Sequence, residues 1–306
     1  MSQPLLRRVI LAAADSQDVA RLVNRYGPKL GAFRFVAGTT LEETVPVVLA
    51  LNRQGLLVTL DRLGEGEVDH STADGAKAAY LAILDKIKEA GLSSHVSLKL
   101  TQLGLDLDPK AAEGRLVEIV GRAEATGSFV RIDMEDSRHT EATVELFSRL
   151  RPAHPAVGIV IQSYLRRSEA DMRKMAELGA NVRVVKGAYL EAEPIAFADK
   201  AEVDRHYQRL VEMHLGAGCF TAVATHDPAL IDSTVAYVKS HGIGRDRFEF
   251  QMLFGIRPDL QRQLVAEGWQ VRVYVPFGPD WYPYFMRRLA ERPANLAFFL
   301  KNLWAR

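Results

Sequence analysis

Six polar side chains interrupt or follow short apolar runs of this sequence, and their types are those that bind and transform small molecules. They are Lys99 in "HVSLKL", Asp133 in "RID", Gln162 in "VIQ", Arg183 in "VRVVKGAY", His226 in "VATH" and Tyr274 in "VRVYV". A buried lysine needs a partner, and Asp133 is the natural one because an ion pair offsets much of the cost of burying either charge. Any single member is compatible with a helix cap or an internal salt bridge, but six together favour a shared polar site.

The stretch "YPYFMRRLAER", residues 282–292, places two adjacent arginines on an apolar helical pattern. Four residues at i, i+3, i+4 and i+7 share one face of this predicted helix: Tyr284, Arg287, Arg288 and Glu291. Arg287 and Glu291 can pair at i, i+4. Two guanidinium groups on this face would form a fork for a planar carboxylate, which arginine binds in a bidentate way.

Short β-branched runs alternate strictly with longer helical patterns, and these elements must position the polar residues. The runs cover residues 56–60, 95–100, 129–134, 158–162, 182–186, 221–225, 248–253 and 271–275. The helical patterns cover residues 73–90, 110–126, 139–151, 168–179, 200–217, 228–241, 258–267 and 281–291. Alternation of this kind requires parallel pairing through right-handed crossovers, and eight units in about 235 residues match a closed barrel.

The predicted fold class is therefore α/β: a (β/α)8 TIM-type barrel with a short N-terminal helical arm and a final helix over the barrel mouth. We expect residues 1–52 to form the arm, with helical patterns near 16–26 and 41–53 and a ninth apolar run, "FRFVAG", at 33–38. Residues 53–306 would form the catalytic barrel with its C-terminal helix and tail. A doubly wound sheet is the alternative, weakened because no glycine-rich nucleotide fingerprint follows any run. A parallel barrel places its chemistry at the carboxyl ends of the strands, where the polar residues lie.

The composition indicates a globular protein that acts on a small molecule. The chain has 306 residues, a net charge of +1 and 48% hydrophobic residues, without the clustered basic face that nucleic-acid binding requires. Its one cysteine, Cys219, fits a reducing compartment, so we expect a cytoplasmic protein. Asp15 cuts short the apolar run of the N-terminus, and no segment reaches the roughly 18 apolar residues of a membrane span.

Other chemistries compete for the same residues. "DMED" at 133–136 offers oxygen ligands for magnesium, but no matching acidic residues close the neighbouring runs, so we expect no metal. His214 and Cys219 are two soft ligands and do not make a zinc site, which favours a core role. A desolvated Lys99 or Lys186 could serve a Schiff-base aldolase, and a catalytically silent barrel could serve as a binding scaffold.

The residues resemble a known family, the flavin-dependent proline dehydrogenases, in their bacterial single-domain form. The segment "YPYFMRRLAER" is similar to the closing-helix signature of that family. The blocks "LDRLGE", "VSLKL", "RIDME", "VRVVKGAY" and "ATHD" resemble its other motifs in the same order. The resemblance covers roughly residues 37–296, which is the whole predicted barrel.

The resemblance implies roles for individual residues around the substrate. Arg287 and Arg288 would hold the proline carboxylate with help from Lys99, which would be paired to Asp133. Asp133 and Arg183 would be the catalytic residues. The walls of the pyrrolidine site would be Leu253, Tyr274 and Tyr284. Glu65 would pair with Arg287 to close the site and exclude water, and Glu291 would orient the arginine fork.

The resemblance also implies FAD over the strand ends. Arg183 would lie near flavin N5, and Gln162 at the pyrimidine edge. The other contacts would come from Met134, Lys186, Gly187, Ala188, Thr225 and His226. L-proline would be oxidised to Δ1-pyrroline-5-carboxylate by hydride transfer from C5 to N5, the first step of proline catabolism to glutamate.

A quinone would reoxidise the flavin, as is usual in this family. The aromatic tail "AFFLKNLW" would then give a peripheral contact with the inner face of the cell membrane, although packing on the barrel is the expected role of such a helix. The resemblance leaves the oligomeric state open.

Overall fold

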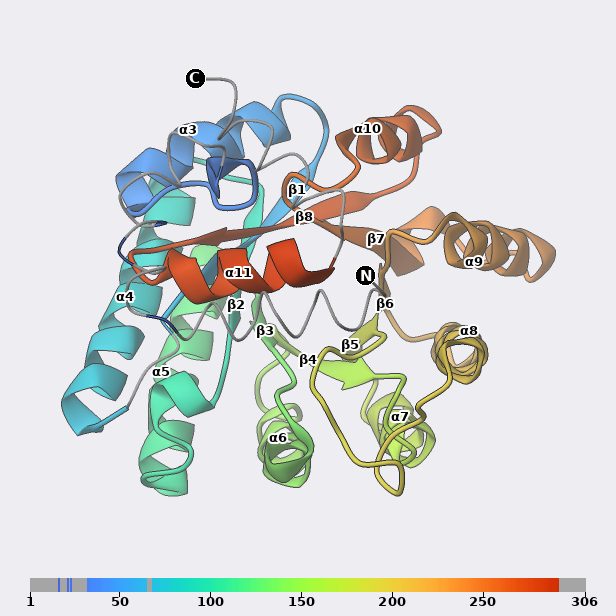
Figure 1. Cartoon of the computed structure of the whole chain (residues 1–306), viewed down its shortest axis with the longest axis horizontal. Coiled ribbons are helices and arrows are strands. Elements are labelled where there is room, and N and C mark those ends of the chain that lie inside the picture. Colours follow the sequence, from blue (N-terminus) through green and yellow to red (C-terminus); the bar gives the residue numbers. More distant parts are fainter. Residues whose placement is uncertain (1–15, 17–20, 22, 24–31, 65–67, 292–306) are drawn as a thin grey trace.

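Eight parallel strands close into a barrel in chain order, and β1 pairs with both β2 and β8 (Figure 1). The computed structural model describes residues 16, 21, 23, 32–64 and 68–291. The strands are β1 Leu57–Arg62, β2 Ser94–Leu98, β3 Val130–Ile132, β4 Val157–Gln162, β5 Asn181–Val185, β6 Thr221–Ala224, β7 Phe248–Leu253 and β8 Val271–Phe277. The predicted barrel is confirmed, and the doubly wound alternative is wrong.

Helices alternate with the strands and cover the outside of the barrel (Figure 1). They are α4 His70–Glu89, α5 Pro109–Thr126, α6 Ser137–Leu150, α7 Ser168–Glu177, α8 Lys200–Gly216, α9 Pro228–Ser240 and α10 Pro258–Ala266; the helix after β8, α11 Trp281–Glu291, lies elsewhere. Several begin with an aspartate whose side chain accepts a hydrogen bond from the first helical turn: Asp69, Asp108, Asp136, Asp199 and Asp227. Each such N-cap fixes a helix start at the rim where the preceding strand ends.

The strands alternate apolar residues that face the helices with polar residues that face the barrel interior. In β7, Phe248, Phe250 and Met252 are buried in the main apolar core, whereas Glu249 and Gln251 bond to each other and to arginines of other strands. The same alternation holds around Lys99. Leu98 and Leu100 are in the apolar core, and Lys99 lines the internal cavity.

The described part of the N-terminal segment packs against the end of β8 and against α11. It contains a 3-10 turn, Ala32–Arg34, and helix α3, Leu41–Asn52. The run "FRFVAG" is not a barrel strand: Phe35 and Val36 are buried against residues of α11, and the amide of Ala37 donates to Pro276 O at 2.9 Å. The helical pattern near 16–26 lies largely outside the described residues, and the division of the chain at residue 52 stays a prediction.

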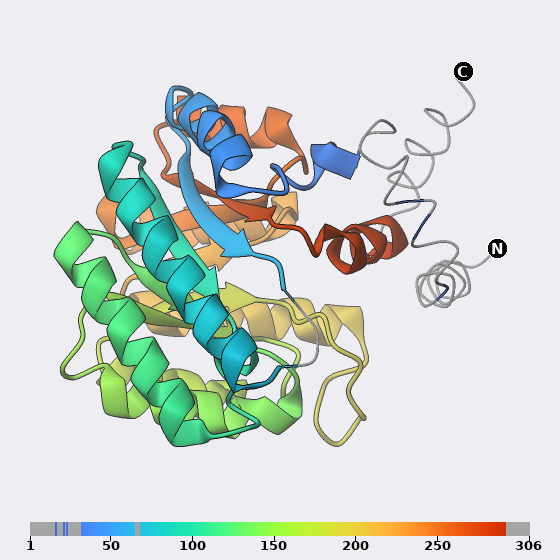
Figure 2. The same ribbon diagram turned by 90° about the vertical axis from the view of Figure 1, so that its left-hand side faces the viewer.

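Helix α11 crosses the barrel mouth, on the side toward which the strands point (Figures 1 and 2). Its apolar face is buried with Phe35 and Leu63, and Trp281 and Phe285 contact each other edge to face at 5.7 Å between ring centroids. The helix can therefore aim its other face into the barrel. Among the described residues, no helix is both long enough and apolar enough to cross a bilayer.

Candidate active site

A cavity of about 870 Å³ opens at the carboxyl ends of the strands, beneath α11. This volume is near the upper end of the range for small-molecule and cofactor sites, about 300 to 1,000 Å³. Fifteen of the residues singled out in the sequence line it: Lys99, Asp133, Met134, Gln162, Arg183, Lys186, Gly187, Ala188, Thr225, His226, Leu253, Tyr274, Tyr284, Arg287 and Arg288. Two others, Glu65 and the side chain of Glu291, lie outside the described residues.

Asp133 is the centre of the hydrogen-bond network at the cavity floor. Its Oδ1 accepts from Arg183 Nη1 at 2.7 Å and from the Ser97 hydroxyl at 2.8 Å. Its Oδ2 accepts from the Tyr274 hydroxyl at 2.8 Å. The carboxylate is thus fixed by strands on opposite sides of the barrel. The ion pair that the structure gives Asp133 is with Arg183; its pairing with Lys99 stays a prediction.

Tyr274 remains a neutral donor in this network. Burial, and then the negative charge of Asp133, raise the pKa of Tyr274 well above its ordinary value. The Arg183 guanidinium lies over the Tyr274 ring, 5.2 Å from its centroid. Tyr274 was expected to wall the substrate by apolar contact; the structure shows that its hydroxyl also orients Asp133.

Arg183 lines the cavity and keeps one buried donor without a partner among the described residues. Its side chain is 4% exposed, Nε donates to Gln251 Oε1, and Nη1 donates to Asp133, whereas Nη2 has no hydrogen-bond partner among the described residues. A buried guanidinium nitrogen without an acceptor is costly. A ligand with an acceptor atom at this point would satisfy it.

The arginine pair of α11 enters the cavity from above. Tyr284, Arg287 and Arg288 all line it, and the Arg288 guanidinium lies 5.1 Å from the centroid of the Tyr284 ring. The cavity also contains Lys99 and the apolar side chain of Leu253. Two guanidiniums and an ammonium around one space match a carboxylate ligand, and the aromatic and apolar walls match its hydrocarbon part.

Two lysines and two aspartates form an ion-pair cluster on another wall. Lys186 Nζ lies 2.6 Å from Asp204 and 3.2 Å from Asp227, and Lys200 also pairs with Asp204. Lys186, Lys200 and Asp227 line the cavity. The sequence pointed to Lys186 alone. Lys200 and Asp204 were missed, although their i, i+4 spacing at a helix start is a visible signal for a pair.

Gly187 is required by the tight fit of the loop that follows β5. Its φ is +112°, and a Cβ added there would lie 2.1 Å from the ring of Tyr164. The glycine was expected to allow close approach to a cofactor; the structure gives Tyr164 as the group that approaches it. Any larger residue at position 187 would therefore displace the backbone segment that lines the cavity.

Three of the predicted cofactor contacts bond to the backbone. Gln162 Nε2 donates to Glu135 O at 2.8 Å, the Thr225 hydroxyl accepts from the amide of Asp227, and His226 Nε2 accepts from the amide of Leu253 at 2.9 Å. These bonds tie the loop after β3 to the end of β4, and the loop after β6 to the end of β7. The side chains still line the cavity, so a positioning role and a binding role are compatible.

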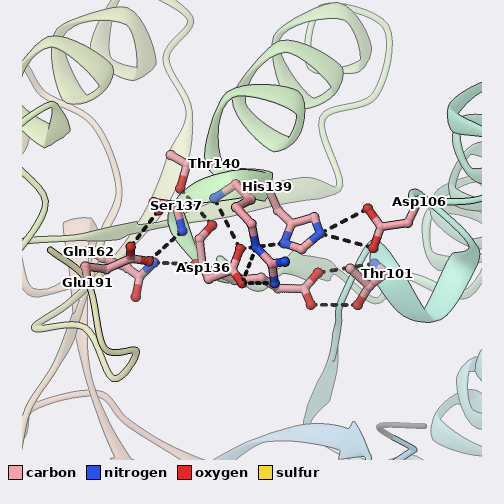
Figure 3. A network of polar contacts seen from close by, with 10 residues as sticks. Thr101, Asp106, Asp136, Ser137, His139, Thr140, Gln162 and Glu191 are labelled. Carbon is pink, nitrogen blue, oxygen red and sulfur yellow. Dashed lines mark hydrogen bonds and ion pairs between the residues drawn. The ribbon is translucent and has the colours of Figure 1, made fainter. Parts of the chain in front are cut away.

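A polar network at the rim joins the loops that follow β2, β3, β4 and β5 (Figure 3). Glu135 accepts from the amide and hydroxyl of Thr101, at 3.2 and 2.6 Å. Glu191 accepts from the amide and hydroxyl of Ser137 in the first turn of α6. His139 bridges Asp136 at 2.8 Å and Asp106 at 3.0 Å.

The acidic stretch 133–136 is occupied by these contacts. Asp133 bonds to Arg183, Glu135 to Thr101, and Asp136 caps α6. Within the described ranges, no cluster of three or more histidine, cysteine, aspartate or glutamate side chains has the arrangement of a metal site. His214 is buried and bonds to the Thr221 hydroxyl at 2.8 Å, in agreement with a core role.

Comparison with known proteins identifies the family. A sequence profile described as "Proline dehydrogenase" matches residues 45–301. The chain belongs to the proline dehydrogenase family. Proline dehydrogenase 1 of Bacillus subtilis (strain 168) is 45% identical over 299 residues, which cover 98% of this chain and 99% of that protein. The proline dehydrogenase of Deinococcus radiodurans is 42% identical, and 99% of each chain is covered.

Solved structures agree with this assignment. Proline utilization A (PutA) from Bdellovibrio bacteriovorus, inactivated by N-propargylglycine, superposes with a TM-score of 0.82 at 26% identity. A PutA variant from Bradyrhizobium japonicum gives a TM-score of 0.73 at 26% identity. This chain spans about a third of these longer proteins, 36% and 34% of their lengths.

Membership of the proline dehydrogenase family implies a flavin cofactor, and the cavity fits one. The unsatisfied Arg183 Nη2 offers a donor to an acceptor atom of a flavin ring. Lys186 and Lys200 supply positive charge on the same cavity surface, where phosphate groups would need it. The residues present therefore suit both an uncharged ring and an anionic arm.

Proposed function

We propose that this chain oxidises L-proline to Δ1-pyrroline-5-carboxylate with FAD as its cofactor, as the first step of proline breakdown to glutamate. One observation carries the proposal: a single cavity contains the arginine pair of α11 and the Arg183–Asp133 pair of the barrel. The first pair suits the carboxylate of an amino acid. The second suits a site where charge develops during a redox reaction.

Arg287 and Arg288 bind the proline carboxylate, assisted by Lys99. Leu253, Tyr274 and Tyr284 surround the pyrrolidine ring and exclude water from it. This enclosure favours hydride transfer, because water around the reacting carbon would compete for space and weaken every electrostatic contact. Glu65 pairs with Arg287 when substrate is bound, and Glu291 orients the fork.

Bound FAD would supply the hydride acceptor, its N5 atom, for the hydrogen at C5 of proline. Arg183 donates toward that edge of the ring, and Asp133 holds Arg183 in place. Gln162 contacts the pyrimidine edge, with Met134 beside it. Lys186, Gly187, Ala188, Thr225 and His226 line the path of the remaining cofactor. The amine of proline loses its proton to solvent as the C5=N bond forms, which completes the loss of one hydride and one proton.

We further propose that a quinone takes the electrons, with peripheral membrane contact through the tail at 297–304, which lies outside the described residues. The proposal rests on the family resemblance alone. A soluble short-chain quinone should restore the oxidised flavin spectrum after anaerobic reduction by proline. Failure of every quinone tested, with reoxidation only by oxygen, would remove this part.

The first test is the absorbance spectrum of the purified protein, followed by anaerobic addition of L-proline. Flavin bands that bleach with proline support the cofactor and the substrate together. Bands that persist leave a flavoprotein with another substrate. Protein that is colourless and does not bind added FAD contradicts the whole proposal.

The Schiff-base alternative has little structural support at Lys186. Its ammonium is held between Asp204 and Asp227, and a charged lysine is not a nucleophile. Borohydride in the presence of a carbonyl substrate such as pyruvate should therefore trap no covalent adduct at Lys186, which mass spectrometry of the intact chain would check.

A further inference from the structure

We infer that Gln251 and Glu249, two inward-facing residues of β7, are positioning residues that aim Arg183 at the flavin. The inference rests on the proposed function and deepens it. Neither glutamate nor glutamine has to touch the substrate for this role: Gln251 acts on Arg183, and Glu249 acts on Gln251. Together they form a relay from the barrel interior to the redox site.

The contacts form a continuous chain. Arg183 Nε donates to Gln251 Oε1 at 2.5 Å, and Gln251 Nε2 donates to Glu249 Oε1 at 2.5 Å. Glu249 Oε1 also accepts from Arg272 Nε at 2.8 Å, and Arg272 Nη1 donates to Val58 O at 2.8 Å. Glu249, Gln251 and Arg272 are each 5% exposed or less. Hydrogen bonds at both ends hold the Gln251 amide in place, whereas Glu249 Oε2 has no hydrogen-bond partner among the described residues.

The chemistry of the links fixes the orientation of the Gln251 amide. A carboxylate only accepts and a guanidinium only donates, so the amide must turn its NH2 toward Glu249 and its oxygen toward Arg183. Glu249 stays ionised in this setting: although burial alone would raise its pKa, Arg272, Gln251 and Arg131 together outweigh burial and lower it. The glutamate therefore determines which end of Gln251 meets the arginine.

Strand β6 leaves the space that the Arg183–Gln251 contact needs. In the register of the sheet, Ala222 lies between Arg183 of β5 and Glu249 of β7, and Ala224 is opposite Gln251. Both are inward-facing positions occupied by a single methyl group. Longer side chains there would separate β5 from β7, so the side chains of these two strands meet across β6.

The relay leaves Arg183 one free nitrogen in a defined direction. Nε is held by Gln251 and Nη1 by Asp133 and Ser97, so the planar guanidinium has contacts on two of its three nitrogens. Nη2 is the nitrogen without a partner among the described residues, and Arg183 lines the cavity. A displacement of about 1 Å of such a group costs on the order of a hundredfold in rate.

The experiment replaces Gln251 with methionine in the full-length, FAD-loaded protein. Gln251→Met keeps the length and volume of the side chain but removes the acceptor for Arg183 Nε. The affinity for reduced flavin, relative to the affinity for oxidised flavin, should fall about tenfold. This change lowers the two-electron midpoint potential by about 30 mV. The limiting rate of anaerobic bleaching by proline should fall about tenfold to a hundredfold, with the proline Michaelis constant changed by less than about threefold.

A matched control separates positioning from loss of stability. Thr221→Val removes another buried hydrogen bond, to His214, on the outward face of the neighbouring strand β6. Its unfolding midpoint should fall by an amount similar to that of Gln251→Met, while its flavin potential and bleaching rate stay at the wild-type values. A merely structural role of Gln251 predicts that the two variants behave alike.

A rescue variant sharpens the test. Gln251→Glu restores an acceptor for Arg183, because two neighbouring carboxyl groups share one proton and keep the total charge of the pair. Its flavin potential should lie closer to wild type than that of Gln251→Met. Should Gln251→Met not fold, Glu249→Gln carries the test: the Gln251 amide can then turn its NH2 toward Arg183, and the bleaching rate should fall.

The outcomes distinguish this inference from the proposed function. Wild-type protein without flavin bands, or with bands that proline does not bleach, contradicts the proposed function. Normal wild-type behaviour together with an unchanged potential and rate in Gln251→Met overturns the positioning role alone. A wild-type rate in Glu249→Gln removes Glu249 from the relay.

Discussion

The charged residues of the cavity fall into two groups that differ in how tightly they are held. Arg183 and Asp133 are fixed by several strands of the barrel, whereas Arg287 and Arg288 belong to a helix that crosses the mouth. The first group suits chemistry that needs exact placement of charge. The second suits capture of a ligand, because a helix over an opening can admit and enclose it.

The carboxylate role of the arginine pair predicts a selective loss of substrate binding. Arg287→Met or Arg288→Met keeps much of the packing but removes a charge-assisted hydrogen-bond donor, worth about 1.5 to 3 kcal/mol. The Michaelis constant for proline should rise about tenfold to a hundredfold in steady-state assays, with the flavin content unchanged.

L-Prolinamide supplies the control for these variants. It lacks the carboxylate charge, so its Michaelis constant should be high in the wild type and nearly the same in both variants. Variants that lose prolinamide and proline equally would show that the arginines shape the cavity without recognising the carboxylate.

The sequence located the site residues by type and spacing but not their partners. Lys99, Asp133, Arg183 and the α11 arginines converge because the carboxyl ends of parallel strands meet at one opening. Gln251 was missed because it lies two positions before the end of β7 and its partner across β6, Arg183, is distant in sequence. Which side chains meet across a barrel depends on the register between neighbouring strands, and the sequence of a single strand does not determine that register.

At the scale of elements, the helices start where the site needs fixed loops. Asp136 caps α6, and its neighbour His139 ties this helix to Asp106 in the loop after β2 (Figure 3). Arg138, which bonds to Asp136, lowers the pKa of that aspartate, although burial opposes the shift. The result is a histidine held between two carboxylates.

The contacts of His139 with Asp106 and Asp136 predict a pH-dependent contribution to the stability of the folded state. Burial lowers the pKa of His139, but Asp106, Glu135 and Asp136 outweigh it and raise the net value above 6.5. Protonation therefore favours the folded state: the contribution is fully present below the unfolded pKa and is lost as pH rises through the folded one. Because Asp106 is largely exposed, the effect should be about 0.5 to 1 kcal/mol.

Denaturant unfolding of wild type and His139→Gln at two pH values measures this contribution. Glutamine is neutral throughout, so the difference between the two proteins should be larger at about pH 6 than at about pH 9. A difference that grows toward alkaline pH would contradict the sign derived from the carboxylates.

The loop after β5 gives a second prediction at this scale. Gly187→Ala introduces a Cβ against the Tyr164 ring at a φ of +112°, so the free energy of unfolding should fall by about 1 to 3 kcal/mol. The FAD dissociation constant should rise, because the displaced backbone lines the cavity. Equilibrium unfolding and flavin titration of the apoprotein measure the two effects.

Gly179→Ala is the matched control. Gly179 also has a positive φ, +55°, but nothing lies within 4 Å of its added Cβ. It should lose about 1 kcal/mol from backbone strain and bind FAD as the wild type does. Equal FAD affinities in the two variants would remove the link between the Tyr164 contact and the cofactor path.

Element boundaries were predicted best where periodicity and caps agree. The pattern at 281–291 coincides with α11, whereas β3 is only three residues long, Val130–Ile132, within the predicted run 129–134. Asp133 and Met134 follow the strand and line the cavity, and the amide of Asp133 still donates to Leu98 O at 2.8 Å. The run "FRFVAG" is apolar because it packs against α11 outside the sheet, and not because it forms a barrel strand.

The whole molecule combines an apolar outer core with a polar barrel interior. Branched aliphatic residues usually fill such a barrel, yet Arg131, Glu249 and Arg272 are buried inside this one. Burial lowers the pKa of Arg131 well below its ordinary value, and Arg183 adds to the effect. Buried charges are weak evidence for stability. Their presence fits a barrel whose interior supports an electrostatic site.

FAD should therefore stabilise the barrel as a whole. The cavity is lined by residues from β1 to β8 and from α11, so a ligand that fills it binds only the folded chain. At one hundred times the dissociation constant, FAD should add about 2.7 kcal/mol. For a domain of this size, that corresponds to a rise of roughly 5 °C in the unfolding temperature of the apoprotein.

Calorimetry of the apoprotein measures this rise in unfolding temperature. Lumiflavin, which has the flavin ring without the phosphate arm, tests the two parts of the cavity separately in the same experiment. It reaches Arg183 but not the Lys186 and Lys200 wall, so at the same concentration its shift should be smaller. In Lys186→Met the FAD shift should fall toward the lumiflavin value, while Lys77→Met, which removes a lysine paired to Glu118 on the outer helices, should not change it. Equal shifts for FAD and lumiflavin in the wild type would mean that the lysine wall does not hold the phosphates, and the ion pairs of Lys186 with Asp204 and Asp227 would then be purely structural.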